Sequence, residues 1–478
     1  MDTSQEPAAV AVPMTSAPAQ QPRPHVLLVA APFQSHVNPL LRLGRRLAAK
    51  GLLVTFTTAL RAGIRLAPGD GDGDGDSGGG RLRVEVLRGG GIWAPDDPRF
   101  RVAGDMARHV EAAGPAALEE LVRGQAEAGR PVTCVVANAF VPWALRVAGE
   151  LGLPRAMLWI QSCALLSVYY HHVHALAAFP EADAPGSVAV ALPGIPDLEY
   201  DDLKPLLIYV SGHDLWRQML VDDLGQAREA MPPWVFVNTF DELEHPAIEG
   251  LREHFPVIPV GPLIDPDADS DGDGEDGCTA WLDARTPRSV VFVAFGSLVN
   301  NESDEVAEIA AGLAATGRPF LWVVRDDNRA LLSADALAAA ACGGRDCRGK
   351  VVPWCAQGRV LAHPAVGCFV THCGWNSTAE ALAGGVPVVA SPRWSDQRIN
   401  ARFLVDVHGV GARAPTPLTR DALRERVEEV MGGPEAEAMA RRAASWKEKA
   451  RAAVRGGGSS DQGVQAFVDQ IRRAGSWH

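Results

Sequence analysis

Polar side chains that could bind a phosphate gather in one segment of the sequence, residues 354–397. The apolar run 367–371 is typical of a buried strand, a short turn follows it, and we expect a helix to begin at Ser377. A helix that follows a parallel strand presents unpaired N–H groups and the positive end of its dipole, which suits a diphosphate. The side chains of His372, Asn376 and Ser377 add hydrogen-bond donors, so the segment predicts an anion site.

Each of these features also has a purely structural explanation. Ser377 and Glu380 have the S-x-x-E spacing of a capping box, which needs no ligand. Trp354 and Trp375 could be core aromatics, and His372 could satisfy a backbone carbonyl. We favour the ligand site because all of these residues share one strand–turn–helix context, in which Trp354 offers a flat face to a base.

A histidine near the start of the sequence could act as a general base. The apolar run 25–31 predicts a strand buried on both faces of a parallel sheet, and leucines at helical spacing predict a helix after Pro39. His36 lies between the two, in a loop at the carboxyl end of the strand. An imidazole there could take a proton from a substrate near neutral pH.

Buried strands alternate with helices on both sides of an acidic, glycine-rich run that extends from Asp265 to Gly277. This alternation predicts an α/β fold of two Rossmann-like, doubly wound domains that face each other across a cleft. The acidic run is the best candidate for the linker between them. A similar run at 69–80 and this one are simple repeats, which favours flexible insertions over calcium loops.

Composition and charge exclude several kinds of partner. The net charge of −13 argues against nucleic acid and anionic membranes, which both need a basic face. No run of about eighteen apolar residues occurs, so we expect no membrane span. Residues 1–24 have the composition of a disordered tail and lack the features of a signal peptide. We therefore expect a cytoplasmic protein.

The cysteines predict neither disulfides nor a metal site. Eight cysteines in a chain of 478 residues indicate reduced thiols. The nearest thing to a metal-binding pattern is the set Cys355, Cys368, His372 and Cys373. This set lacks the paired short spacings of zinc sites. His372 and Cys373 are adjacent and would point to opposite sides of an extended chain, so we expect no metal.

Residues 354–397 closely resemble the signature segment of plant UDP-dependent glycosyltransferases (glycosyltransferase family 1), which have the GT-B fold. The stretches PFQSHVNPLLRLGRRLAAKGLLVTF, WLD…SVVFVAFGS and GGSSDQGVQAFVDQI also resemble landmarks of this family, so the resemblance extends from His25 onward. It implies an inverting transferase, expected to be a monomer, that moves a sugar from a UDP-sugar to a small aromatic acceptor without a cofactor.

The resemblance also implies how the chain is divided. We expect a tail, an acceptor-binding domain, a linker, a donor-binding domain, and a C-terminal segment that packs back on the first domain. These parts are residues 1–24, 25–262, 263–277, 278–455 and 456–478.

The same resemblance implies roles for the polar side chains of the donor site. Trp354 would stack on the uracil with Gln357 nearby, and Glu380 would bind the ribose hydroxyls. The diphosphate would be bound by His372, Asn376, Ser377 and Ser297.

The sugar would lie beside Trp375, and its hydroxyls would be bound by Asp396 and Gln397. In the family, a glutamine at the last position of the segment accompanies glucose, so Gln397 favours UDP-glucose as the donor.

The sequence departs from the family at the second catalytic position. The family pairs its catalytic histidine with an aspartate, whereas this chain has Asn138 opposite His36. An amide can orient the imidazole but cannot offset a positive charge that develops on it. A carboxylic acid acceptor, with a pKa of about 4, is already ionised at neutral pH, whereas a phenol, with a pKa of about 10, needs a base. Either another carboxylate takes the place of the aspartate or the base has less work to do, and the second possibility favours carboxylic acids as acceptors.

Two further stretches, ANAFVPWALRVAGELGLPRAMLWIQSCA and LPGIPDLEYDDL, resemble the branch of the family that makes glucose esters of phenolic acids. We therefore predict a glucose ester of a phenolic or indolic carboxylic acid. Transfer to phenolic hydroxyls, as in flavonoids, and an inactive sugar-nucleotide binding protein are the alternatives. The candidate acceptor-pocket residues are Trp93, Phe140, Trp143, Gln161 and Tyr169.

Overall fold

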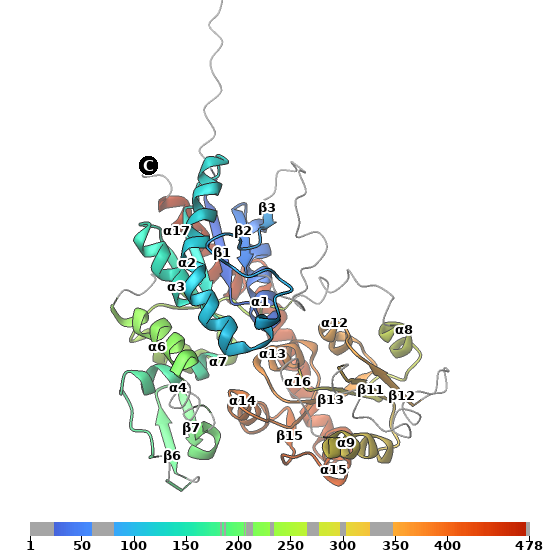
Figure 1. Ribbon diagram of the computed structural model, residues 1–478. Coiled ribbons are helices and arrows are strands. Elements are labelled where there is room, and N and C mark those ends of the chain that lie inside the picture. The colour runs from blue at the N-terminus through green and yellow to red at the C-terminus, as the bar shows by residue number, and fades with distance from the viewer. Residues whose placement is uncertain are drawn as a thin grey trace, which may run out of the picture.

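Two sheets, each flanked by helices, make up most of the computed structural model (Figure 1). It describes residues 23–59, 81–181, 184–185, 188–204, 206, 214–229, 234–264, 277–296, 303–325 and 348–474. Several parts of the sequence named above lie outside the described residues: Ser297, most of the predicted tail, the run at 69–80, and all of the predicted linker except its ends. Of the helices described, none is both long enough and apolar enough to cross a bilayer.

The first sheet is parallel and comes from the N-terminal half of the chain. Its strand order is β3-β2-β1-β4-β5-β8-β9. The chain adds β2 and β3 on one side of β1 and then places β4 on the other, so the carboxyl ends of β1 and β4 form a topological switch point, where open α/β sheets bind ligands. The strands are β1 His25–Ala30, β2 Leu53–Thr58, β3 Arg81–Val84, β4 Cys134–Asn138, β5 Arg155–Trp159, β8 Trp234–Val237 and β9 Val257–Pro259.

The second sheet is also parallel and repeats this arrangement with the order β12-β11-β10-β13-β14-β15. Its switch point lies between β10 and β13. The strands are β10 Val290–Ala294, β11 Phe320–Val323, β12 Gly349–Val352, β13 Val366–Thr371, β14 Val388–Ala390 and β15 Gly411–Arg413. The predicted α/β architecture with two doubly wound sheets is confirmed.

The apolar runs form central strands because both of their faces are covered. In β1, Leu27 and Val29 belong to the core under α2, α3 and α4, whereas Val26 and Leu28 belong to the core under α1 and α17. The helices packed around the first sheet are α1 Gln34–Ala49, α2 Ala103–Glu127, α3 Pro142–Glu150, α4 Cys163–Val173, α6 Asp214–Glu229, α7 Asp241–Arg252 and α17 Ser459–Ala474, with the short 3₁₀ helix η1 Pro98–Arg101 before α2.

The second sheet is covered in the same way. The helices of this half are α8 Cys278–Asp283, α9 Ser303–Ala315, α12 Gln357–Ala362, α13 Trp375–Gly384, α14 Gln397–Arg402, α15 Arg420–Gly432 and α16 Ala436–Val454; one π-helical turn, η3 Phe403–Val407, follows α14. Phe292 and Ala294 of β10 face the core that includes α13 and α16, whereas Val291 and Val293 face α9 and α15.

A short hairpin is followed by a segment that forms ion pairs with the second half of the chain. It consists of β6 Ala189–Leu192 and β7 Ile195–Glu199. Just after it, Asp202 is 4% exposed, and its carboxylate lies 3.2 Å from Arg402 Nη1 and 3.5 Å from Arg413 Nη2. Part of the stretch LPGIPDLEYDDL therefore contacts the second half of the chain.

The last helix, α17, returns to the first sheet, where the red C-terminal helix lies beside the blue strands in Figure 1. Phe467 is fully buried and packs edge-on against Trp234 and Phe236 of β8, with ring centroids 5.1 and 4.9 Å away. Ser460 Oγ donates a hydrogen bond to the Gly261 carbonyl, and Lys50 pairs with Asp461 at 2.6 Å.

Replacing Phe467 with alanine tests how much α17 stabilises the first sheet. We expect Phe467→Ala to lower the free energy of unfolding by about 3–5 kcal/mol, because it leaves a cavity between α17 and β8. Urea unfolding followed by tryptophan fluorescence measures the change. Asp469→Ala, on the exposed side of α17, is the control and should change it by less than about 0.5 kcal/mol. Equal effects of the two substitutions would contradict this packing.

Candidate active site

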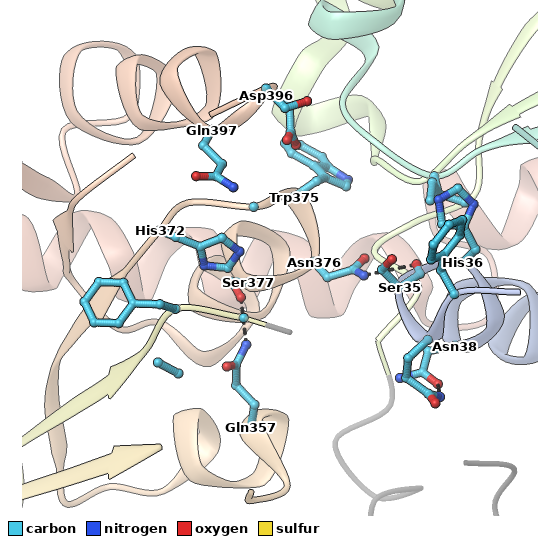
Figure 2. A pocket seen from close by; sticks show the side chains of 18 of the residues that line it. Ser35, His36, Asn38, Gln357, His372, Trp375, Asn376, Ser377, Asp396 and Gln397 are labelled. Carbon is cyan, nitrogen blue, oxygen red and sulfur yellow. Dashed lines mark hydrogen bonds between the residues drawn. The ribbon is translucent and has the colours of Figure 1, made fainter. Parts of the chain in front are cut away.

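A cleft of about 1490 Å³ lies where the carboxyl ends of the two sheets face each other. The first half contributes residues that follow β1, β4 and β5, and the second half contributes residues that follow β10, β12, β13 and β14. The cleft therefore touches both switch points, as expected for ligand sites in doubly wound sheets. Figure 2 shows side chains from both halves pointing toward this space.

Helix α1 begins earlier than the sequence predicts. His36 and Val37 both donate backbone hydrogen bonds to the Phe33 carbonyl at 2.9 Å, so His36 lies in the first turn of the helix and not in a loop. The expectation that the helix starts after Pro39 is wrong, because a proline is tolerated here inside the helix. Pro39 has no N–H, which leaves the carbonyl of Ser35, four residues earlier, without its helical partner.

The free Ser35 carbonyl is used by the second half of the chain. Asn376 Nδ2 donates to it at 3.2 Å, as the dashed line in Figure 2 shows. A side chain that was predicted to bind the diphosphate is thus also hydrogen-bonded to the helix that carries His36. The first turn of α1 and the start of α13 are therefore joined directly.

Asn138 holds the junction between β1 and α1. It is 1% exposed, accepts from the Ala31 N–H at 3.0 Å through Oδ1, and donates to the His36 carbonyl at 3.0 Å through Nδ2. Both ends of this amide are engaged with backbone groups on either side of the turn. A carboxylate could accept from Ala31 but could not donate to His36, so this contact requires the amide.

His36 lies in an apolar environment with its ring against two phenylalanines, Phe33 and Phe140, at centroid distances of 5.6 and 5.7 Å. Burial lowers its pKa to about 4, although the neighbouring Asn138 amide and Ala139 backbone favour the charged form. Nδ1 makes no hydrogen bond with the part of the chain described. The imidazole is therefore neutral at physiological pH, the form that a base or a hydrogen-bonding partner of the acceptor requires.

Phe140 is held against His36 by a residue that the sequence did not single out. Its φ of 69° is strained for a residue with a side chain, and its N–H donates to Asp223 Oδ2 at 2.7 Å. Asp223 is 2% exposed, and burial raises the pKa of its carboxyl well above the usual range. The strained turn at the end of β4 is thus fixed by a buried carboxyl group on α6.

Helix α13 begins at Trp375 with Gly374 as its N-cap. Ser377 therefore lies within the first turn and not at the cap, so the predicted helix start at Ser377 and the capping-box alternative are both wrong. The physical reason is that the Gly374 carbonyl already accepts the first helical hydrogen bond, from Thr378 N at 2.9 Å. Glu380 is consequently free of any capping role.

Glu380 is instead held by side chains around it. Gln357 Nε2 donates to Glu380 Oε2 at 2.6 Å and to Ser377 Oγ at 2.9 Å. Arg42 Nη1, from α1, lies 3.9 Å from Glu380 Oε1. The structure thus brings the predicted ribose-binding carboxylate together with Gln357 and Ser377, and adds a cation from the other half.

His372 lies between two glycines at the second switch point. A Cβ atom at Gly296 or at Gly374 would lie within 2.7 Å of the His372 ring, so larger residues would displace it. Burial and the nearby Arg393 guanidinium lower the pKa of His372 to about 4. Like His36, this histidine lines the cleft as a neutral ring.

The two tryptophans of the donor segment differ in exposure. Trp354 lines the cleft and is 47% exposed, so part of its side chain borders the open space. Trp375 is 6% exposed, and its indole N–H donates to the Asn238 carbonyl of the first half at 2.8 Å. Trp375 therefore contacts the cleft and also joins the two halves.

Asp396 and Gln397 are positioned by their own loop and helix. Gln397 Oε1 accepts from the backbone N–H groups of Arg393 and Trp394, at 2.8 and 3.2 Å, which leaves its Nε2 for a ligand hydroxyl. Asp396 accepts from Asn400 Nδ2 at 2.8 Å. Burial raises the pKa of Asp396 to about 6, while hydrogen bonds from Asn400 and Gln161 oppose the shift.

The candidate acceptor residues divide into two groups. Phe140, Gln161 and Tyr169 line the cleft, but Trp93 and Trp143 do not. Trp143 is a core residue, 1% exposed, and Trp93 stacks on His109 at 3.7 Å. The prediction for these two tryptophans is wrong because aromatic type and position in the chain do not distinguish core from cleft.

Sequence reasoning missed several lining residues of α1, among them Ser35, Asn38 and Arg42. A signal for them existed, since their spacing of i, i+3 and i+7 places them on one face of a helix. That signal depended on starting the helix before Pro39. Ser297, predicted as a diphosphate ligand, lies outside the described residues.

The cysteines of the described chain are buried, and no disulfide joins any two of them. Within the same residues, no group of three or more His, Cys, Asp and Glu side chains is placed to hold a metal ion. Cys355 and Cys373 pack in the core beside α13, where burial raises the pKa of the Cys373 thiol.

Comparisons with known proteins agree with this geometry. Residues 262–444 match the family described as UDP-glucoronosyl and UDP-glucosyl transferase. The chain is 42% identical to a gallate 1-beta-glucosyltransferase of Quercus robur, over 94% of this chain and 90% of that protein. It is 40% identical to a cinnamate beta-D-glucosyltransferase of Fragaria ananassa, over 94% and 83% of the respective chains. Os79 of O. sativa, solved with UDP, has a TM-score of 0.80 and 31% identity, over 93% of this chain and 100% of that one.

The chain therefore belongs to the UDP-dependent glycosyltransferases. It is an enzyme with the GT-B fold whose donor is a UDP-sugar and whose acceptor is a small molecule, so the predicted family, fold and enzyme class are confirmed. The expectation that the UDP-sugar is a co-substrate and that no separate cofactor takes part agrees with the family and with the UDP complexes of its structural neighbours.

The low pKa of His36 predicts how stability depends on pH. Its pKa is lowered from 6.5 to about 4 in the folded state, so between these values the unfolded chain binds a proton that the folded chain does not. Above pH 6.5 this proton does not affect the free energy of unfolding. As the pH falls from 6.5 toward 4, binding of the proton by the unfolded chain lowers the free energy of unfolding. For His36→Gln, the loss of stability between pH 7.5 and pH 5 should be smaller than in the wild type by about 2 kcal/mol.

Urea unfolding at the two pH values measures this difference. His245→Gln is the control, because an adjacent Asp241 raises the pKa of the exposed His245, so that its substitution acts in the opposite direction. An acid sensitivity of His36→Gln equal to that of the wild type would show that His36 is not held neutral by burial.

Proposed function

We propose that the enzyme transfers glucose from UDP-glucose to the carboxylate of a small aromatic acid and so forms a glucose ester. The single observation that carries the proposal is the state of the His36 site: a buried neutral imidazole whose expected carboxylate partner is replaced by Asn138, an amide engaged with the backbone. Such a site suits an acceptor that arrives already ionised. The similarity to gallate and cinnamate glucosyltransferases supports the same acceptor class.

In the proposed donor site, Trp354 stacks on the uracil and Glu380 accepts from the ribose hydroxyls. Gln357 orients Glu380, because its Nε2 donates hydrogen bonds both to the Glu380 carboxylate and to Ser377 Oγ on the same helix. The diphosphate is bound by the N-terminus of α13 together with His372, Asn376, Ser377 and Ser297. Trp375 lies beside the glucose, whose hydroxyls interact with Asp396 and with Gln397 Nε2.

The proposed reaction is an in-line displacement with inversion. A carboxylate oxygen of the acceptor forms a bond to the anomeric carbon, and the bond from that carbon to the diphosphate breaks, with UDP taking the electron pair. No proton needs to be removed from an ionised acid. His36 acts by donating a hydrogen bond from its ring N–H to the acceptor carboxylate, which orients the acceptor, and the apolar rings of Phe33 and Phe140 exclude water around it.

We also propose the division of the chain that the resemblance implied. The first sheet with residues 25–262 binds the acceptor, 263–277 connect the domains, and 278–455 bind the donor. Residues 456–478 belong with the first domain, a proposal that the contacts of α17 with α1 and β9 support. The enzyme is proposed to be a cytoplasmic monomer that requires no membrane or nucleic acid.

Competition between acceptors tests the proposal. With UDP-glucose and equal amounts of cinnamic acid and a flavonol, we expect the wild-type enzyme to consume the acid and to release a product that mild alkali hydrolyses. Mass spectrometry of the two products measures the ratio. Clear preference for the flavonol would overturn the acid proposal, and UDP-glucose binding without turnover of any acceptor would favour an inactive binding protein.

Asn138→Asp sharpens the same competition. The new carboxylate loses the hydrogen bond to the His36 carbonyl and can instead stabilise a protonated imidazole, so transfer to the flavonol should rise relative to the acid. The lost donor should also reduce the free energy of unfolding by about 1–3 kcal/mol. Asn138→Ala removes the same hydrogen bonds without adding a charge and should not increase transfer to the flavonol.

A further inference from the structure

Arg42 reaches from the helix of the catalytic histidine to the donor site in the other half of the chain. It lies on α1, lines the cleft and is 8% exposed. Its Nη1 donates to the Leu263 carbonyl at 3.0 Å and lies 3.9 Å from Glu380 Oε1 on α13. Glu380 is also largely buried, with 11% of its side chain exposed. Two opposite charges from different halves, both largely buried, thus lie close together at the edge of the cleft.

The geometry leaves Glu380 ready for a ligand. Its Oε2 accepts from Gln357 and its Oε1 faces Arg42, so the carboxylate is held from two sides while it borders the cleft. A buried carboxylate that loses a charged partner is left incompletely compensated and accepts other hydrogen bonds in a less defined orientation. Arg42 therefore affects how well Glu380 can receive two hydroxyl groups.

A second contact couples the same two helices. Asn376 Nδ2 at the start of α13 donates to the Ser35 carbonyl at 3.2 Å, which is free because of Pro39. Helices α1 and α13 are therefore linked at Ser35 with Asn376 and again at Arg42 with Glu380. Ser35 and Arg42 are seven residues apart, so both links lie on one face of α1.

We propose that Arg42 is a positioning residue for the ribose of the donor. The acceptor half contributes it across the cleft, and it acts through Glu380. The inference rests on the proposed donor site, in which Glu380 accepts from the ribose hydroxyls. It adds that the ribose subsite is completed by α1, so that the nucleotide is recognised only when the helix carrying His36 lies against α13. Donor binding then fixes the distance between the acceptor-binding and donor-binding residues.

The test compares two nucleotides by isothermal titration calorimetry: UDP, and dideoxy-UDP, in which hydrogen replaces both ribose hydroxyls. In the wild type, UDP should bind at least about 10-fold more tightly, because hydrogen bonds from the hydroxyls to a carboxylate are lost in the analogue. In Arg42→Met, UDP should bind about 10-fold more weakly while dideoxy-UDP changes little, so that the ratio of their affinities falls toward one. Arg42→Lys, which keeps a charge, should give a ratio between these two.

Arg46→Met is the matched control. Arg46 lies one turn later on α1 and donates to the carbonyls of Val260 and Pro262, so it anchors the same stretch of chain, but it does not line the cleft. Its substitution should leave the ratio of the two affinities unchanged. Continued binding of dideoxy-UDP by each variant shows that the variant is folded.

The outcomes separate the inference from the function on which it rests. An unchanged ratio in Arg42→Met and Arg42→Lys, with dideoxy-UDP still bound, would overturn the role of Arg42 and leave the donor assignment intact. An equal fall of the ratio in Arg46→Met would also overturn it, since anchoring of the linker alone would then explain the effect. Failure of the wild type to bind UDP would instead refute the proposed donor site.

Discussion

The junction between β1 and α1, held by one buried amide, is the constraint on which the active site depends. Asn138 joins the Ala31 N–H to the His36 carbonyl and so fixes where the strand ends and how the helix begins. The contacts that α1 makes with the second half follow from this start of the helix. Its first turn carries His36, and its face toward α13 carries Ser35 and Arg42. A change in the direction of α1 would move the acceptor site and the contacts to the donor helix together.

Burial gives the site its electrostatic character. His36 and His372 belong to different halves, yet burial lowers the pKa of both to about 4, so two neutral rings border the cleft. The net charge of −13 opposes the approach of anionic substrates, and local cations must therefore compensate for it. Arg42 lines the cleft, and Arg393 lies behind His372 in an ion pair with Glu305 at 2.5 Å. In the proposed function, the ionised acid therefore meets a neutral ring at His36, and the diphosphate meets another at His372.

The sequence predicted the fold and many of the polar side chains that line the cleft, because both depend on local patterns. Apolar runs predicted the buried strands, and one ungapped segment contained Trp354, His372 and Glu380. The start of α13 was missed because the S-x-x-E spacing of Ser377 favours a cap, whereas the backbone of Gly374 serves as one. Such competition between a side-chain signal and a backbone conformation cannot be read from residue types.

The contacts between the halves could not be predicted for a different reason. Two contacts join residues that are more than 300 positions apart in the sequence: the hydrogen bond from Asn376 to Ser35 and the ion pair of Arg42 with Glu380. Their meeting depends on how two sheets face each other, which no local pattern records. Likewise, Asn138 was interpreted through the ring of His36, whereas its amide binds the backbone on both sides of the turn.

The most direct test of the central claim uses an acceptor that carries both competing groups, p-hydroxycinnamic acid. Incubation with UDP-glucose, followed by NMR of the product, shows whether glucose is attached to the carboxylate or to the phenol. We expect attachment to the carboxylate, as an ester of inverted anomeric configuration that alkali hydrolyses, because the Asn138–His36 pair suits an acceptor that is already ionised. A product glucosylated mainly on the phenol would contradict it.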